Sequence, residues 1–377
     1  MLSEGSENNY LDFWIAIPVS LLIALGIVLV YTSSYYMAEI KKFPHGQYYY
    51  LIQHLIRVGI GIGALIVAIV FPIQILKKHA LKILLFTIGL LLFVFIIGHI
   101  SHGAKRWIRL FPFSFQPAEA AKFALIVYVA KYLSEKGRNI RLFRRGFLPA
   151  FTVILILTFL VALQPALSTS FLIFLIGMTL LFYGGARLFH LMGSLVIMGA
   201  LFLILVNTFP HAKERIQKFK RKESNYQVTQ AHIGMAEGKI FGVNLGRGKE
   251  KFLYLPEPHT DFIYAIVGEE MGFAGALTVI LLYIIFTLRG WHIASILEKD
   301  IFASSLAFGF TFMIILYALV NISVVLNIVP TTGLPLPFVS YGGSSTLFNL
   351  AVVGFLLNLS GMAQKVKNEK KKNVRKK

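Results

Sequence analysis

The sequence predicts an all-α polytopic membrane protein with about ten transmembrane helices. Of its 377 residues, 56% are hydrophobic and only 14% are charged, and the mean hydropathy is +0.71. These values are far from those of ordinary globular domains. In addition, apolar runs of about twenty residues, the length needed to cross a bilayer, recur along the chain.

The ten apolar runs define the predicted spans. They cover residues 12–33, 58–76, 81–100, 117–133, 147–165, 167–183, 191–208, 262–288, 301–325 and 344–360. The first run is too long for a signal peptide and lacks a cationic start and a small-residue cleavage site, so we expect it to be retained as a span. We predict one membrane domain over residues 1–360, then a basic, disordered tail over residues 361–377 that rests on anionic lipid.

Lysine and arginine in the short loops predict the orientation. One face carries Lys77, Lys78, Lys82, Lys136, Arg138, Arg141, Arg144, Arg145, Arg187 and the basic tail. That face is predicted to be cytoplasmic, with both termini there. The outer face then carries residues 34–57, 101–116, 326–343 and, between the seventh and eighth spans, the large segment 209–261. The net charge of +20 lies beside apolar spans, which favours anionic lipid over nucleic acid as its partner.

Several classes of chemistry have no supporting motif. Cysteine is absent, which excludes disulfides, thiolate metal sites and a cysteine nucleophile. The sequence has no Walker A motif and no HExxH motif, so it supports neither nucleotide-driven transport nor a zinc site of that type. It also has no D-x-D pair, so we do not expect a nucleotide-sugar donor. We expect neither a nucleotide nor an organic cofactor.

Asp261 is the strongest candidate for catalysis. Only three aspartates occur, and the predicted topology places Asp12 and Asp300 on the inner face and Asp261 alone on the outer face. It lies in the stretch LPEPHTDFIYAIVGEE (255–270), at the start of the eighth span. A carboxylate at a helix start is the structural alternative. We nevertheless favour a functional Asp261, because ionisable residues at membrane spans are costly to keep.

The acidic and polar neighbours of Asp261 supply further candidates. Glu257, His259 and Thr260 precede it and are predicted substrate-binding residues, whereas Glu269 and Glu270 are predicted structural supports. A second motif, FQPAEAAK (115–122), places Glu119 and Lys122 three residues apart on one helix face. A structural ion pair is the alternative there.

A third motif, PTTGLPLPFVSYGGSS (330–345), cannot be helical throughout. Irregular backbone at membrane depth occurs where it is buried in protein or lines a polar cavity. We therefore expect a re-entrant turn that closes over a site, with Ser340 and Ser344 as substrate-binding candidates.

The outer face is rich in cations, which could bind a phosphate-bearing ligand. The candidates are Lys105, Arg106, Lys122, Arg215, Lys218, Lys249 and Lys251. The alternative is a solvated, lipid-attracted segment and, for residues 105–109, an interfacial anchor.

FQPAEAAK, YLPEPHTDFIYAIVGEEMG and PTTGLPLPFVSYGGSS, in this order with ten spans, resemble the SEDS family (RodA, FtsW and SpoVE) of membrane peptidoglycan glycosyltransferases, with the FtsW and SpoVE branch favoured. The resemblance covers the chain from about Trp14 to Leu359. It implies lipid II as substrate, Asp261 as the essential residue, a class B penicillin-binding protein as partner and the bacterial cytoplasmic membrane as location.

The implied reaction joins two lipid-linked sugars with a prenyl pyrophosphate as leaving group. Because that group leaves readily, one base suffices, unlike the paired carboxylates of most glycosidases. Cations or a divalent ion, Mg²⁺ or Mn²⁺, would stabilise the departing charge, with Asp261 and Glu257 as candidate ligands.

The sequence departs from the family pattern in one segment. The family has a QPDLGT-like segment between the fifth and sixth spans, and here Ala166 and Ser168 replace its acid and its glycine. Two other functions are considered. One is a lipid II flippase or transporter, which would place charges near mid-membrane between repeated halves. The other is a scaffold that only recruits a partner.

Overall fold

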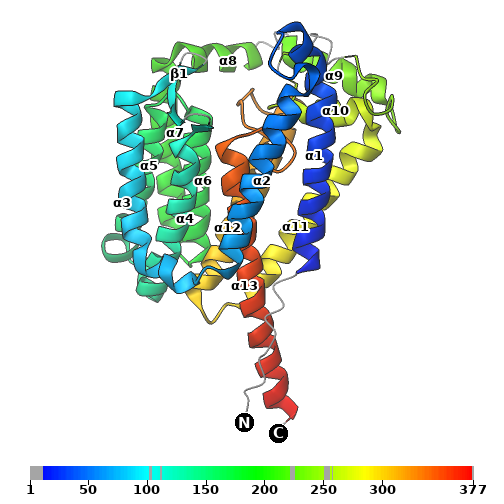
Figure 1. Cartoon of the computed structure of the whole chain (residues 1–377). Coiled ribbons are helices and arrows are strands. Elements are labelled where there is room, and N and C mark those ends of the chain that lie inside the picture. The colour runs from blue at the N-terminus through cyan, green and yellow to red at the C-terminus, as the bar shows by residue number, and fades with distance from the viewer. Residues whose placement is uncertain are drawn as a thin grey trace.

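The computed structural model describes residues 12–101, 104–110, 113–220, 226–249, 255–256 and 258–375. Long helices run between two faces, which we call the upper and the lower face (Figure 1). Short helices and a strand lie at the upper face, and the C-terminal helix extends beyond the lower face. This architecture confirms the predicted all-α polytopic fold.

The bundle consists of ten long helices within the described residues. They are α1 (Phe13–Ile40), α2 (Tyr49–Val70), α3 (Ile73–Ile97), α4 (Pro117–Lys136), α5 (Leu148–Ala162), α6 (Leu167–Tyr183), α7 (Leu188–Thr208), α11 (Gly272–Ile296), α12 (Ile301–Val325) and α13 (Ser344–Arg375). Eight helices of the described part are long and apolar enough to cross a membrane, where α5 is counted together with the helical turn before it as Phe143–Ala162. The other two long helices, α4 and α6, coincide with predicted spans, although α6 has only 17 residues.

Shorter elements connect the long helices. They are α8 (Pro210–Lys220), α9 (Tyr226–Gly238), α10 (Ile263–Glu270), the 3₁₀ helices η1 (Gly46–Tyr48) and η2 (Gly137–Arg141), the π-helix η3 (Phe143–Phe147), and the strands β1 (His99–Ser101), β2 (Ala104–Leu110) and β3 (Phe113–Phe115). The strands form an antiparallel sheet in the order β1-β2-β3. The upper face therefore carries folded structure, including most of the large segment between α7 and α11.

Helices α4, α12 and α13 pack together in the interior of the bundle. The ring of Phe123 on α4 lies 5.4 Å from that of Phe310 on α12 and 5.6 Å from that of Phe355 on α13. By contrast, α3 and α7 expose large apolar side chains, among them Phe86 at 69% and Phe189 at 85%. Such side chains suit contact with lipid, in which close packing rather than water exclusion holds helices together.

The predicted eighth span, residues 262–288, is wrong at its start. The helix is interrupted after α10, and α11 begins at Gly272 with a φ of +68°. A methyl group at Gly272 would lie 2.4 Å from the backbone nitrogen of Gly242 and 2.5 Å from the carbonyl oxygen of Ile240. Glycine is therefore required by both the left-handed backbone and the close approach. Only α11 has the length and hydropathy of a span, and α10 stays at the upper face (Figure 1).

The predicted disorder of the tail is also wrong in the described residues. Helix α13 continues through the basic residues as far as Arg375. After Gly361 the sequence contains no proline or glycine, and lysine, glutamine and glutamate propagate a helix well once it has begun.

Asp12 and Asp300 lie at the lower face, as predicted, and both cap helices. The Asp12 side chain accepts from the backbone N–H of Trp14 at the start of α1. It also forms an ion pair with Arg289, with 2.8 Å between Oδ2 and Nε. The Asp300 side chain accepts from the backbone N–H of Ala303, 3.1 Å away. Both carboxylates thus have structural roles.

Candidate functional site

Asp261 lies in the turn that leads into α10 at the upper face. Its side chain is partly exposed, and the Thr260 hydroxyl donates to its Oδ1 at 2.9 Å. The N-cap residue of α10 is Phe262, so Asp261 does not occupy the helix-capping position that was its structural alternative. The predicted site residues Thr260 and Asp261 therefore contact each other through their side chains.

Asn321 on α12 holds the backbone of this turn. Its Nδ2 donates to the carbonyl oxygen of Asp261 at 2.8 Å and to that of Leu334 at 2.7 Å. One buried amide thus joins the turn to the loop between α12 and α13. Sequence reasoning missed Asn321, although a polar residue inside an apolar span was an available signal.

The loop between α12 and α13 covers the turn, in agreement with the predicted re-entrant segment. It has no helix or strand over residues 326–343, and many of its side chains are buried. Tyr341 donates its backbone N–H to the carbonyl oxygen of His259 at 2.9 Å. A methyl group at Gly333, where φ is +69°, would lie 3.9 Å from Oδ2 of Asp261. The loop therefore lies against the Asp261 carboxylate.

The two predicted serines both bond to backbone groups. The Ser340 hydroxyl accepts from the backbone N–H of Leu336 at 2.8 Å. The Ser344 hydroxyl accepts from the backbone N–H of Gln116 at 2.9 Å and donates to the carbonyl oxygen of Ser114 at 3.1 Å. Ser344 thus fixes the start of α13 to the start of α4.

His259 is buried, with 3% of its surface exposed. The centre of its ring lies 4.6 Å from that of Tyr50 and 5.3 Å from that of Tyr341. The guanidinium of Arg57 lies over the Tyr341 ring, 4.2 Å from the centre of that ring. Burial lowers the pKa of His259 to about 3, with the charges of Lys41 and Arg57 adding to the shift. His259 is therefore a neutral packing residue of the site.

Glu119 and Lys122 form a buried ion pair, with 2.8 Å between Nζ and Oε2. The Nζ of Lys122 also lies 3.7 Å from the centroid of the Tyr317 ring on α12. Tyr317 and Asn321 are four residues apart and so share a face of α12. The pair therefore lies inside the bundle and contacts the helix whose Asn321 binds the backbone of Asp261.

The cations of the upper face differ in environment. Arg106 on β2 is half-buried, and in the described part of the structure its Nε has no hydrogen-bond acceptor. Desolvation, and after it the charge of Arg215 on α8, lowers the pKa of Arg106. Lys249 is exposed, and its Nζ lies 3.6 Å from Oε2 of Glu237.

Other candidates fall beyond the described side chains. Lys105 lies in β2 and Lys218 in α8, but the structure does not describe their side chains. Lys251 and Glu257 lie outside the described residues. Within the described residues no group of three histidine, aspartate or glutamate side chains could hold a metal ion.

Glu269 and Glu270 support the fold, as predicted. The Glu269 carboxylate accepts from the backbone N–H of Lys249, and the Glu270 carboxylate accepts from the Thr32 hydroxyl at 3.1 Å. These contacts fix α10 to the preceding segment and to α1. Ala166, at the family's acidic position, is the N-cap of α6 and forms no side-chain cap.

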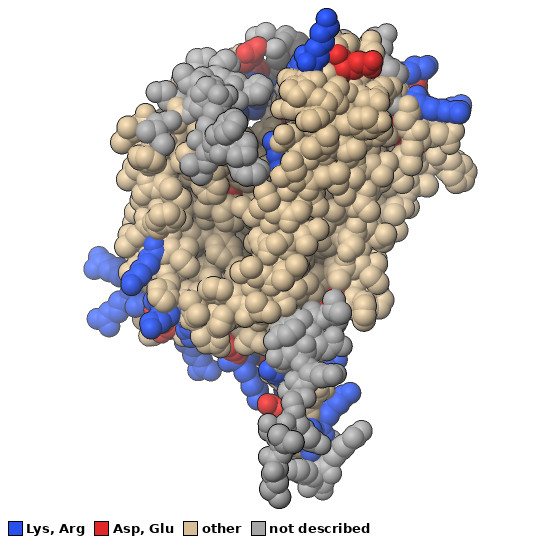
Figure 2. Space-filling view, viewed as in Figure 1, with Lys and Arg blue, Asp and Glu red and all other residues tan. Residues whose placement is uncertain are grey.

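Together these features define an integral membrane protein with a polar site at one face of a helical bundle. Figure 2 shows the upper half of the molecule hollowed, with basic and acidic side chains inside the hollow. The chain belongs to the FtsW/RodA/SpoVE family of cell cycle proteins, whose sequence profile matches residues 13–365. It is a multi-pass bacterial membrane protein.

Named relatives are similar over nearly the whole chain. A probable peptidoglycan glycosyltransferase FtsW of Trichlorobacter lovleyi is 38% identical over 93% of both chains. Stage V sporulation protein E of Bacillus subtilis is 35% identical over 93% of this chain and 96% of its own.

Two solved structures share the fold. A chain from a peptidoglycan synthase complex that coordinates polymerization and crosslinking is 25% identical, covers 93% of this chain and 97% of its own, and has a TM-score of 0.75. The rod shape determining protein RodA of Thermus thermophilus is 25% identical, covers 93% of this chain and 96% of its own, and has a TM-score of 0.68.

Proposed function

We propose that the protein is a peptidoglycan glycosyltransferase that polymerises lipid II at the outer face of the cytoplasmic membrane, with Asp261 as general base. The observation that carries the proposal is the setting of Asp261. Its carboxylate is partly exposed, and its backbone is held by Asn321 beneath the loop from α12 to α13. The names of the relatives agree with this activity.

In the proposed reaction, Asp261 removes the proton from a sugar hydroxyl of the acceptor. The hydroxyl oxygen then forms a bond to the anomeric carbon of the donor, and the bond from that carbon to the pyrophosphate breaks. The prenyl pyrophosphate leaves with the bonding electrons, and the anomeric configuration inverts. Because pyrophosphate is a good leaving group, the site needs a base and no acid.

The leaving group develops negative charge, which the guanidinium groups of Arg106 and Arg215 are suited to stabilise. Lys105, Lys218, Lys249 and Lys251 are further candidates for contact with the substrate. A divalent ion, when bound, would neutralise pyrophosphate charge. The sequence offers Asp261 and Glu257 as its oxygen ligands.

The same proposal includes orientation and partner. The basic short loops gather at the lower face, so by the positive-inside rule that face and both termini are cytoplasmic. The related chain from a peptidoglycan synthase complex supports a class B penicillin-binding protein as the crosslinking partner.

The test is an assay of detergent-purified protein with lipid II, with and without the partner, analysed for glycan polymer. The proposal predicts polymer from the wild-type chain. The second candidate, a flippase, predicts movement of lipid II across proteoliposome membranes with no polymer. A scaffold would give neither result. These outcomes separate the three functions.

A further inference from the structure

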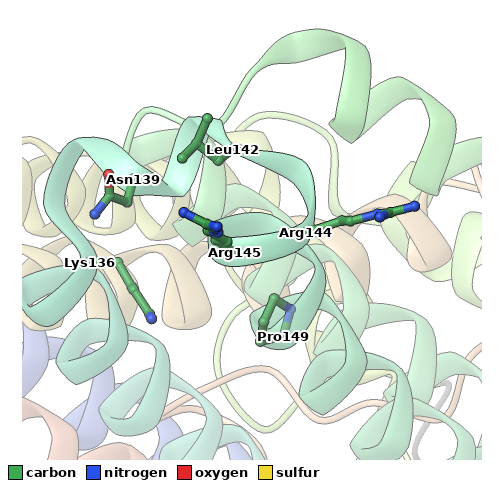
Figure 3. Close-up of a pocket in the computed structure, with 6 residues that line it drawn as sticks. All are labelled: Lys136, Asn139, Leu142, Arg144, Arg145 and Pro149. Atoms are coloured by element: carbon green, nitrogen blue, oxygen red, sulfur yellow. The ribbon is translucent and has the colours of Figure 1, made fainter.

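A second polar site lies at the lower face, where α4 is followed by α5. A pocket of about 380 Å³ is lined there by Lys136, Asn139, Leu142, Arg144, Arg145 and Pro149. Figure 3 shows Lys136 and Asn139 on one side and Arg144 on the other, with Arg145 between them. These residues belong neither to the site around Asp261 nor to the proposed reaction.

The backbone around the pocket is closely packed. A methyl group at Gly146 would lie 2.0 Å from the carbonyl oxygen of Asn139, so η2 and η3 touch through their backbones. The Tyr132 hydroxyl donates to the carbonyl oxygen of Gly146 at 2.7 Å. The carbonyl oxygen of Leu142 accepts from the backbone N–H groups of Gly146 and Phe147, both at 3.0 Å. Short π-helical segments such as η3 are rare in proteins, and those that occur often lie at functional sites.

The positive charge of this loop is not neutralised by ion pairs within the part of the chain that the structure describes. The carboxylate of Glu135, at the end of α4, lies 3.6 Å from Lys131. In the described residues the structure has no ion pair for the loop arginines, which are Arg138, Arg141, Arg144 and Arg145. Uncompensated guanidinium groups that share a pocket favour an anion, and their planar forks match phosphate oxygens.

Apolar side chains border the same pocket. Leu142 and Phe143 are 47% and 49% exposed, and Leu148 at the start of α5 is 38% exposed. Leu142 and Pro149 also form part of the pocket wall. Cations beside exposed apolar groups at the end of a membrane bundle lie at the depth of lipid headgroups. A ligand with both a phosphate and acyl chains would satisfy both kinds of surface.

We propose that this pocket binds the phosphodiester headgroup of an anionic phospholipid in the leaflet at the lower face. Arg145, Arg144 and Lys136 contact the phosphate, and Asn139 donates to it or to the polar headgroup. The acyl chains lie along Leu142, Phe143 and Leu148. The site would secure the α4–α5 loop to the membrane surface, at the face opposite Asp261.

The test is native mass spectrometry of the detergent-purified full chain titrated with dioleoyl phosphatidylglycerol. Arg144→Gln combined with Arg145→Gln is expected to weaken binding by about tenfold or more, since it removes two charge-assisted contacts. The matched control combines Arg138→Gln with Arg141→Gln. It removes the same charge from the same loop, outside the pocket, and is expected to change binding by less than about twofold. Arg145→Lys keeps the charge but loses the planar fork, so its loss of lipid binding should lie between the losses of the two double variants.

Several outcomes would overturn the proposal. Equal losses in the two double variants would mean diffuse attraction to surface charge. If the wild-type chain bound dioleoyl phosphatidylcholine as well as dioleoyl phosphatidylglycerol, the pocket would not recognise an anionic headgroup. Displacement of the lipid by millimolar inorganic phosphate would make the site one for free phosphate. Since the measurement is lipid binding, its failure leaves the proposed polymerase activity unaffected.

Discussion

At the scale of residues, Asp261 is held by contacts that its own sequence segment does not reveal. Its hydroxyl partner, Thr260, is adjacent in sequence, but the amide that fixes its backbone comes from Asn321, sixty residues away. The loop beside its carboxylate lies still further along the chain. The site therefore depends on side chains whose substitution should disturb the position of Asp261 without altering its chemistry.

Asn321→Ala should lower the polymerisation rate and the stability together. It leaves the buried carbonyl oxygen of Leu334 and the partly buried one of Asp261 without the Asn321 donor, at a cost of about 1–3 kcal/mol. Measurement of kcat, KM and the thermal unfolding midpoint checks this. Asn207→Ala is the matched control, because Asn207 on α7 is exposed and, among the described residues, donates to Leu203 of its own helix alone. Equal effects of the two changes would contradict the role of Asn321.

Lys122→Met should destabilise the protein by about 3–5 kcal/mol, because it leaves the Glu119 carboxylate buried without its cation. The double variant with Glu119→Gln should recover most of that loss, and a double-mutant cycle of unfolding free energies measures the coupling. The pair Lys131–Glu135, at 3.6 Å on the same helix with a half-buried lysine and an exposed glutamate, is the control. Lys131→Met should cost about 0–1 kcal/mol. A similarly small cost for Lys122→Met would mean that the buried pair is not formed.

His259 should make stability depend on pH. Its pKa is lowered to about 3 in the folded protein by burial, with Lys41, Arg57 and His54 adding to the shift. Between about pH 6.5 and 3 the unfolded chain binds a proton that the folded chain does not, so the free energy of unfolding falls as pH falls through this window. His259→Phe keeps a ring between Tyr50 and Tyr341 and removes the titrating group.

The measurement for His259 is the unfolding free energy of both proteins from about pH 7 down to pH 4. The wild-type curve should be steeper by up to about 1.4 kcal/mol per pH unit. Parallel curves would show that His259 is protonated equally in the two states. Other titrating groups, His54 included, contribute to the curves of both proteins, so the difference between the two curves reports on His259.

At the scale of elements, the interruption between α10 and α11 determines where the eighth span begins. Gly272 has a left-handed backbone, and the N–H groups of Phe273 and Ala274 donate to the carbonyl oxygens of Lys239 and Ile240 at 2.8 and 3.0 Å. Helix α11 thus uses its first turn to bind the segment after α9.

Gly272→Ala should destabilise this junction by about 1–3 kcal/mol through backbone strain, and the clash with Gly242 and Ile240 should add to that cost. The expected results are a lower thermal unfolding midpoint and faster proteolysis within residues 239–249. Gly63→Ala on α2 is the control, because an added methyl group there meets no atom within 4 Å. Unchanged proteolysis in the Gly272 variant would argue against the docking of this segment.

The long helices could be predicted from the sequence, but the interruptions could not. Hydropathy identifies α12, whose observed bounds equal the predicted 301–325, because each residue of a span must suit apolar surroundings. It did not reveal the break at Gly272, because the cause is contact with Gly242 and Ile240, which only tertiary structure brings near. Likewise, Ser344 was predicted as a ligand residue, but its hydroxyl bonds the backbone of Gln116 and Ser114, which only tertiary structure brings near.

At the scale of the whole molecule, the three aspartates divide between the two faces. Asp12 and Asp300 cap helices at the lower face, whereas Asp261 stands in the polar site at the upper face. The family relationship extends over residues 13–365, so the whole bundle is the functional unit. The cationic pocket at the lower face adds a second site that contacts the opposite membrane surface.

The most direct test of the account compares Asp261→Asn with Asp300→Asn in lipid II polymerisation by the purified protein. Asparagine can keep the contact with Thr260 and is also a good N-cap residue for α12, so both variants should fold with thermal unfolding midpoints near that of the wild type. We predict that Asp261→Asn abolishes glycan polymer and that Asp300→Asn retains it. Normal polymer yield from a folded Asp261→Asn variant would contradict the assignment of Asp261 as the general base.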